Sequence, residues 1–269
     1  MITLTGLRVY PVKSCRGIGL DAAVLTEAGL EHDREWMIVT PDGRFLTQRE
    51  EPRLALISTR LEPGALWLSV PGAMPLEVPL RRPGTPTEVV VWRDHCRAYD
   101  EGDVAARWLD EFLGRPLRLV RFDENHRRQS DEAFTGETRA YTRFADGYAM
   151  LAVSRASLDD LNARLPAPLP MNRFRPNLVL EGLLPYGEDG LGEFGVGEGI
   201  RLKAVKPCAR CAITTTDQDT GKVDGVEPLR TLKAYRWNSS LRGVEFGQNV
   251  IVVAGAGRTL ELGMEIRVA

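Results

Sequence analysis

The stretch EWMIVTPDGRFLTQ, residues 35–48, gives the most direct indication of the fold class. Apolar and β-branched residues occupy 36–39 and return at 45–46, on either side of Pro41, Asp42 and Gly43. This triplet is typical of a tight turn, because Pro presets its backbone angle, Asp bonds to nearby amides and Gly tolerates positive φ. The stretch therefore predicts a β-hairpin.

Further segments of the same β character lie on both sides of this hairpin. Those predicted as strands are LTGLRVYPV (4–12), RLALIST (53–59), ALWLSV (65–70), TEVVVW (87–92), YAMLAV (148–153), PNLVLEG (176–182), IRLKAVKP (200–207), QNVIVVAG (248–255) and TLELGMEIRVA (259–269). Strands without regular helical crossovers argue against a doubly wound nucleotide-binding fold. The predicted class is mainly β with a few helices (α+β).

Three short segments have helical spacing instead: VAARWLDEFL (104–113), SLDDLNARL (157–165) and PLRTLKAYR (228–236). Asp103 is the expected N-cap of the first and Gly114 its terminator, while Ser154 is expected to cap the second. The polar stretch NHRRQSDEAFTGETR (125–139) is the predicted domain junction. We therefore expect two strand-rich modules, residues 1–122 and 123–269.

Composition and charge narrow the class of protein. The chain has 269 residues, of which 43% are hydrophobic and 27% charged, with a formal net charge of −2. A nucleic-acid-binding protein normally carries a basic excess, so we expect no nucleic-acid partner. No apolar run approaches the roughly 20 residues that span a bilayer, so we expect no membrane partner either. Four cysteines are few for this length and indicate reduced thiols and a cytoplasmic protein.

The densest chemical signal is VKPCARCAITTTDQDTG, residues 205–221. Cys208 and Cys211 form a C-x-x-C pair, which could be half of a zinc site, a redox dithiol or two small core residues near a turn. The other half of a zinc site is missing and no β-α-β context surrounds the pair. Arg210 lies between the thiols and favours a reactive thiolate. The stretch TTTDQDTG (214–221), with its hydroxyls and turn-forming Asp and Gly, suits a loop whose amides face an anion.

Three other segments are weak signals when taken singly. Lys13 and Ser14 follow a strand and could bind an anion, although the glycines of a phosphate loop are absent. HDREW (32–36) alone would be a surface ion pair. NRFRPN (172–177) places two arginines around an aromatic residue before a strand.

Together, YPVKSCRG (10–17), HDREW, LAVSRASLDDLN (151–162), NRFRPN, CARCAITTTDQDTG (208–221) and FGQN (246–249) resemble the MOSC proteins. More narrowly, they are similar to the mitochondrial amidoxime-reducing component and its bacterial relatives. The resemblance implies a MOSC N-terminal β module followed by a MOSC β-barrel domain. It also implies a molybdenum cofactor of the pterin-dithiolene type between the two.

The resemblance further implies roles for particular residues. Cys211 would ligate molybdenum and be the catalytic residue. The side chains that would bind the cofactor with it are Lys13, Ser14, Arg34, Ser154, Arg175, Asn177 and Arg210. Arginine and lysine suit the cofactor's phosphate because they donate charge-assisted hydrogen bonds.

The implied activity is the reduction of small N-hydroxylated substrates, namely hydroxylamines, amidoximes and N-hydroxylated bases. The sequence departs from its relatives at Asn249, where the mitochondrial proteins have Tyr. It has neither a dinucleotide-binding G-x-G-x-x-G after a strand nor the cysteine run of an iron–sulfur cluster. We therefore expect electrons from a separate flavin or iron–sulfur reductase. The alternative is a sulfur carrier or molybdenum-cofactor carrier that uses Cys211.

Overall fold

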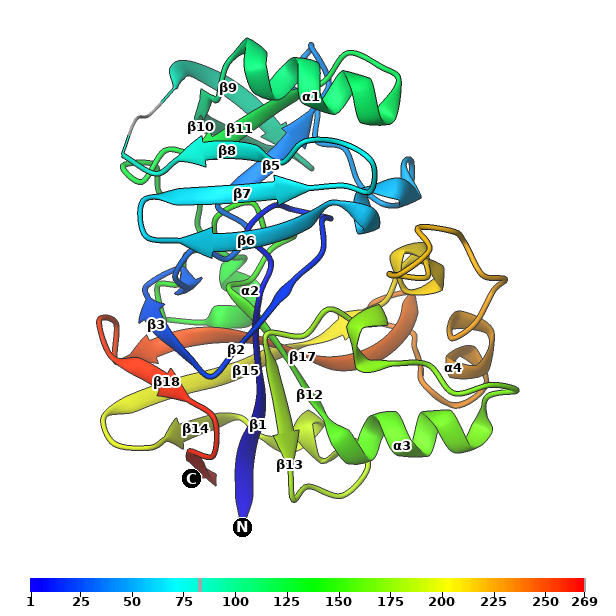
Figure 1. The fold of residues 1–269 in the computed structure, drawn as a ribbon. Helices are drawn as coiled ribbons and strands as arrows, with labels where there is room; N and C mark the ends of the chain where they lie inside the picture. The colour runs from blue at the N-terminus through cyan, green and yellow to red at the C-terminus, as the bar shows by residue number, and fades with distance from the viewer. Residues whose placement is uncertain (82–83, 269) are drawn as a thin grey trace.

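The computed structural model describes residues 1–81 and 84–268, and its secondary structure is dominated by strands (Figure 1). Its described α-helices are α1 (Asp103–Leu113), α2 (Glu132–Thr135), α3 (Arg155–Arg164) and α4 (Leu229–Tyr235). The predicted class, mainly β with a few helices, is confirmed.

The largest sheet closes on itself as a barrel. Its strands, in spatial order, are β12 (Met150–Ser154), β13 (Leu178–Glu181), β1 (Ile2–Val9), β19 (Glu265–Val268), β14 (Glu193–Val196), β15 (Ile200–Ala209) and β17 (Gly243–Ala254). A further pairing of β12 with β17 closes the ring. Beside it, β2 (Ile18–Leu20) pairs with β1 and β16 (Trp237–Asn238) with β17. The barrel core contains Leu4, Leu180, Phe194 and Val250.

The second part contains two smaller sheets, drawn above the barrel in Figure 1. One has the order β5 (Trp36–Val39), β11 (Arg118–Phe122), β10 (Asp94–Asp100) and β9 (Thr85–Val91). The other has the order β6 (Ser58–Glu62), β7 (Ala65–Ser69) and β8 (Leu76–Pro79). Helix α1 packs on this part through Trp108 and Leu109, in a core shared with Trp36 and Leu68.

Strand pairing interleaves the two ends of the chain. β1 lies between β13 and β19, because its alternating apolar residues complete the barrel core. β3 (Ala22–Thr26) pairs with both β18 (Thr259–Glu261) and β4 (Gly29–Leu30). The predicted domain boundary between residues 122 and 123 stays a prediction. Two sheets contain strands from both sides of it, since β1 pairs with β13 and β3 pairs with β18.

Several predicted elements are confirmed. Thr40 N donates to Arg44 O and Leu46 N to Ile38 O, as the predicted hairpin requires. Gly114 ends α1 in the left-handed conformation, with φ 70°. Ser154 caps α3, since its hydroxyl accepts a hydrogen bond from Ser157 N.

Other predicted elements are wrong. The strand expected at residues 53–59 does not form as one element, because Pro52–Leu56 make a 3-10 helix (η1) before β6 begins. Pro52 suits the first helical turn, and Glu51 caps it by accepting from Arg53 N. Asp103 is not the N-cap of α1; Gly102 holds that position and Asp103 is the first helical residue.

The last predicted strand is divided, and the predicted junction is well packed. Residues 259–269 form two strands, β18 and β19, and Ala269 lies outside the described residues. In the polar stretch 125–139, Arg128 is only 5% exposed and donates to Arg143 O, Ala145 O and Asp146 O.

Among the residues described, no helix is both long and apolar enough to cross a membrane.

Candidate functional site

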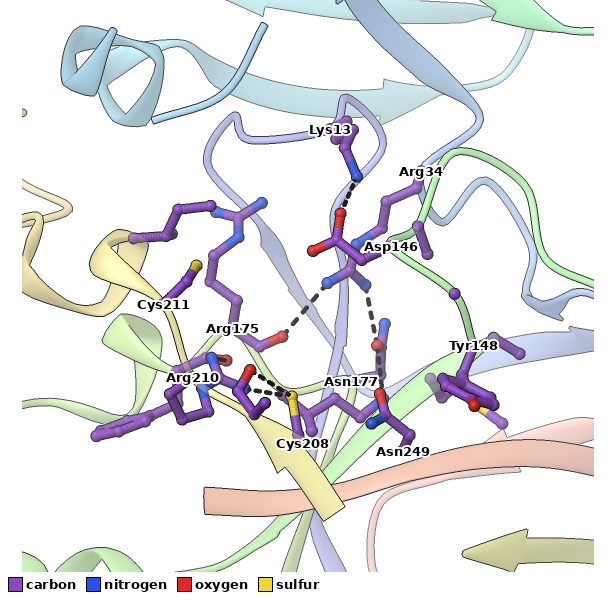
Figure 2. Close-up of a pocket in the computed structure, with 18 of the residues that line it drawn as sticks. Lys13, Arg34, Asp146, Tyr148, Arg175, Asn177, Cys208, Arg210, Cys211 and Asn249 are labelled. Carbon is purple, nitrogen blue, oxygen red and sulfur yellow. Dashed lines mark hydrogen bonds and ion pairs between the residues drawn. The ribbon is translucent and has the colours of Figure 1, made fainter. Parts of the chain in front are cut away.

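A cavity opens where loops from the N-terminal part meet the mouth of the barrel (Figure 2). Seven of the eight predicted site residues line it: Lys13, Ser14, Arg34, Arg175, Asn177, Arg210 and Cys211. Its volume is about 140 Å³, similar to an engineered cavity of about 150 Å³ that admits benzene. The cavity therefore has room for a ring-sized group while remaining open to solvent.

Ser154 is the predicted site residue that the structure does not place at the cavity. It is fully buried, and its hydroxyl lies 2.6 Å from the Ser157 hydroxyl while it caps α3. Its backbone amide donates to Glu188. The side chain is thus used to begin a helix, and we withdraw it from the candidate contacts.

Cys211 stands where β15 ends and a 3-10 turn, η4 (Ala212–Thr215), begins. Its thiol is partly exposed, and Arg49 Nη1 lies 3.8 Å from its Sγ. Arg49 was not predicted, because it is 162 residues away in sequence and belongs to none of the quoted motifs. The guanidinium beside the candidate metal ligand therefore comes from the N-terminal part of the chain.

Arg210 contacts the other thiol. Its Nη1 donates to Cys208 Sγ at 3.0 Å and its Nη2 to Phe174 O at 2.7 Å. The sequence places this guanidinium between both thiols, and the structure assigns it to Cys208. Its Nε is buried and has no hydrogen-bond partner in the structure, so one donor remains available.

The hydroxyl run after Cys211 mainly builds the turn. Thr214 and Thr215 donate to Cys211 O and Ala212 O, closing η4. These two hydroxyl protons are already used within the turn, and the prediction that the amides of this loop face an anion stays a prediction. Ile213 is the residue of this turn that lines the cavity.

The loop that follows is braced from both parts of the chain. Gln218 exchanges side-chain hydrogen bonds with Gln48 at 2.9 and 3.1 Å, and both amides are buried. Arg16 donates to Gln218 O at 2.6 Å. Arg173, only 2% exposed, donates to Thr215 O and Asp217. These contacts determine where Cys211 stands relative to the N-terminal part.

Two arginines form a compact positive cluster at the cavity wall. The guanidinium carbons of Arg34 and Arg175 lie 4.3 and 4.2 Å from the centre of the Tyr10 ring. Arg175 is 8% exposed, and burial lowers its pKa to about 10, with the Arg34 charge adding to the effect. Within the described residues its guanidinium has no ion-pair partner. A buried cation without a counter-ion favours an anionic ligand.

Arg34 is held in place by its neighbours. Its Nη1 donates to both oxygens of Asp33, at 2.8 and 2.6 Å. It also donates to Asn177 Oδ1 at 2.9 Å (Figure 2). Asn177 also donates to Arg8 O, so its amide orients Arg34 instead of pointing freely into the cavity. HDREW alone indicated a surface ion pair, but Asp33 is buried and Arg34 partly buried, and the pair positions Arg34 at the cavity.

Three cavity residues have the left-handed backbone conformation that non-glycine residues seldom adopt. They are Ser14 (φ 67°), Arg34 (φ 46°) and Arg175 (φ 55°). Such strain costs about 1–3 kcal/mol per residue and gathers where binding or catalysis requires it. The backbone conformation of these three residues therefore lowers local stability.

Lys13 forms the opposite side of the cluster. It is 6% exposed, and its Nζ donates to Asp146 Oδ1 at 2.6 Å and to Phe144 O at 2.8 Å. Burial lowers the pKa of Lys13, and the Asp146 carboxylate partly offsets this. Asp146 was not predicted, because its loop is positioned by Arg128 and no local motif marks it.

The alternatives left open for the cysteine pair also have structural answers. The four cysteines are free thiols. Among residues 1–81 and 84–268, no three His, Cys, Asp or Glu side chains gather as they would in a zinc site. The zinc interpretation therefore has no support within this part of the chain.

Comparisons with known proteins agree with this architecture. Residues 1–116 match the MOSC N-terminal beta barrel domain and residues 140–267 the MOSC domain. These matches show that the chain contains the two domains of a MOSC protein.

Individual relatives narrow the class. The chain is 38% identical over 244 residues to mitochondrial amidoxime-reducing component 1 of Mus musculus, covering 87% of this chain and 71% of the relative. It is 37% identical to component 2 of Bos taurus and 38% identical to component 1 of Homo sapiens, each covering 87% of this chain and 72% of the relative. The chain belongs to the MOSC family that contains the mitochondrial amidoxime-reducing components.

Proposed function

We propose that this protein is a molybdenum-cofactor-dependent reductase of small N-hydroxylated compounds. The observation that carries the proposal is a partly exposed thiol, Cys211, in one cavity with a cluster of cationic side chains. The relatives' names, which describe amidoxime reduction, support the same activity.

The residues present fit the cofactor chemically. A thiolate is a suitable ligand for a soft transition metal, and Cys211 offers one. A phosphate needs charged donors, and Arg175 is buried with no carboxylate bonded to it among the described side chains. The buried Nε of Arg210 lacks a partner, as expected of a donor whose acceptor belongs to a ligand.

Each residue then has a role in holding the cofactor. Arg34 and Arg175 would bind the phosphate, with Lys13 and Ser14 beside them. Asn177 would act by fixing Arg34, and Arg210 would donate from the barrel. Because both parts of the chain contribute, the site lies at their junction, where ligand sites are common.

Bound there, the cofactor would supply the two-electron reduction of an N–OH bond to N–H and water. The balanced reaction consumes two electrons and two protons for each N–O bond broken. The protein's part is to bind the substrate near Cys211, to orient it and to supply fixed charges. Arg49 is in contact with the Cys211 thiol, and the Lys13–Asp146 pair lines the same cavity.

The electrons would come from a separate flavin or iron–sulfur reductase that docks transiently. A cytoplasmic location, predicted from reduced cysteines, is part of the same proposal. The second candidate is a sulfur or cofactor carrier, which the partial exposure of Cys211 would also permit.

One experiment separates these functions. The protein is expressed in a host that makes the cofactor, and molybdenum content and benzamidoxime reduction with reduced viologen are measured on the same sample. One molybdenum per chain with turnover supports the reductase. Molybdenum without turnover supports a carrier, and absence of molybdenum contradicts both cofactor-based proposals.

A further inference from the structure

Trp92 occupies a backbone position that a bulky residue normally avoids. It forms, with Arg93, the two-residue turn between β9 and β10, where Val91 pairs with Asp94. Its φ is 58°, a value that hairpin turns of this length usually reserve for Gly or Asn. The indole is also 50% exposed. A strained, exposed tryptophan invites a functional explanation.

The contacts of Trp92 lead to Cys211. Its ring lies 4.7 Å from the guanidinium carbon of Arg49, and Arg49 Nη1 lies 3.8 Å from Cys211 Sγ. Trp92 makes two further contacts. Its indole Nε1 donates to Asp146 Oδ1 at 3.2 Å, and its ring centre lies 5.1 Å from the centre of the Phe45 ring. Trp92 is thus fixed by Asp146 and Phe45 and in turn fixes Arg49.

The charge of Arg49 is not neutralised by a bonded carboxylate within the described part of the chain. Asp146 is close enough for their charges to interact, but its Oδ1 is already bonded by Lys13 and Trp92. In the proposed function, Arg34 and Arg175 are matched by a phosphate. Among the described residues, Arg49 therefore remains a positive charge without a bonded carboxylate, 3.8 Å from Cys211 Sγ and beside the position proposed for the substrate.

We propose that Arg49, held by Trp92, determines charge selectivity at the entrance to Cys211; this inference rests on the proposed function. An amidoxime is weakly basic and neutral near pH 7, whereas the amidine formed from it is strongly basic and cationic. Arg49 repels the cationic product more than the neutral substrate, which favours product release. Trp92 is a positioning residue, because it acts through Arg49.

The test compares affinity for product with affinity for substrate. Benzamidine binding is measured by calorimetry on the cofactor-loaded protein, and KM is measured for benzamidoxime. Arg49→Met removes the charge but keeps an apolar side chain on Trp92, so benzamidine should bind about fivefold more tightly, as one unit charge across a solvated gap implies. Arg49→Lys keeps the charge and should stay within about twofold of wild type.

Trp92 variants test the positioning role. Trp92→Ala frees Arg49 and should strengthen benzamidine binding about twofold to threefold, whereas Trp92→Phe should restore the wild-type affinity because it keeps the ring. Matched controls are Trp237→Ala, since Trp237 is 52% exposed and contacts Lys233, and Arg60→Met, since Arg60 lies over Trp67. Among the described residues, neither control residue makes the contact with Cys211 that distinguishes Arg49.

A failure of the Arg49 role can be distinguished from a failure of the proposed reductase function. Equal benzamidine affinities for wild type and Arg49→Met would overturn the charge-selectivity role, whatever the turnover. A wild-type protein without benzamidoxime reduction would overturn the reductase, and the calorimetric comparison would still decide the role of Arg49. Tighter benzamidine binding in both controls would also contradict the inference, because the effect would then not be specific to Arg49.

Discussion

The arginine cluster and the Cys211 loop face the same cavity but are built in different ways. Arg175 is buried and Arg34 partly buried against Tyr10, and Asp33 and Asn177 fix Arg34 through short hydrogen bonds. Cys211 is partly exposed at a chain turn. In the proposed function, the first region is a preformed anion site, and the second keeps the thiol accessible.

This difference follows from the chemistry each region has to support. Burying a cation costs free energy that a bound anion recovers, so in the proposed function the arginine cluster is preorganised for a phosphate. In the same proposal the thiol binds a metal that also has to meet the substrate, and it therefore has to remain open on one side. The Cys211 loop is accordingly held by hydrogen bonds to Gln48 and Arg16 from the N-terminal part and to Arg173 from the barrel domain.

The largest expected effect is the loss of the thiol. Cys211→Ser replaces a thiolate with a harder oxygen donor of much higher pKa, so turnover should fall by more than about a hundredfold. Cofactor held through its phosphate should partly remain. Benzamidoxime reduction and molybdenum content are measured together, with Cys208→Ser as the matched control that keeps most activity. Equal loss in both variants would refute a single protein ligand.

The second effect concerns the arginine cluster. Arg175→Ala should cost about 2–5 kcal/mol of cofactor binding, or about thirtyfold to several thousandfold in affinity. Folding should be little affected, because the variant removes a buried charge that has no bonded carboxylate among the described residues. Arg34→Ala should lose cofactor similarly, but it also leaves Asp33 buried and unpaired, so its stability should fall.

Molybdenum content and thermal unfolding separate these two contributions. Arg60→Ala is the control, since Arg60 lies on an exposed strand position away from the cavity. Full molybdenum loading in Arg175→Ala and Arg34→Ala would contradict the proposed anion site.

How much of this could be predicted depends on how local each signal is. Arg34, Arg175 and Cys211 lie in short motifs beside strands, so the resemblance could single them out, and the structure brings all three to one cavity. Their roles toward a cofactor stay predictions. Arg49 and Asp146 act across 162 and 133 residues, and no local pattern marks them. Their roles arise only when two loops fold against each other.

The errors also have physical causes. Ser154 was expected to contact the cofactor, but the same serine signal describes a helix N-cap, and the structure uses it so. Residues 53–59 alternate like a strand, yet Pro52 and the Glu51 cap make their first part a 3-10 helix. A short apolar run does not distinguish strand from helix by itself.

The third prediction concerns a substitution that would displace Tyr10, the ring against which Arg34 and Arg175 pack. A Cβ added at Gly17 would lie 2.4 Å from Tyr10 Cε1, so the ring on which both arginines rest would have to move. Gly17→Ala should therefore cost about 1–3 kcal/mol of stability and lower molybdenum content as well. Gly19→Ala is the control, because an added Cβ there has no atom within 4 Å. Identical unfolding and loading in the two variants would show that Tyr10 does not support the arginines.

The smallest effect needs no substitution and concerns which thiols react. Burial raises the pKa of Cys15 to about 12 and that of Cys96 to about 11. Only a thiolate is alkylated, so at pH 8.5 these two should stay unmodified while the partly exposed Cys208 and Cys211 react. Mass spectrometry after iodoacetamide treatment should find two modified thiols in the cofactor-free protein and four in urea. With molybdenum bound, protection of Cys211 should leave Cys208 as the one site modified, and modification of Cys211 in the loaded protein would contradict its assignment as the ligand.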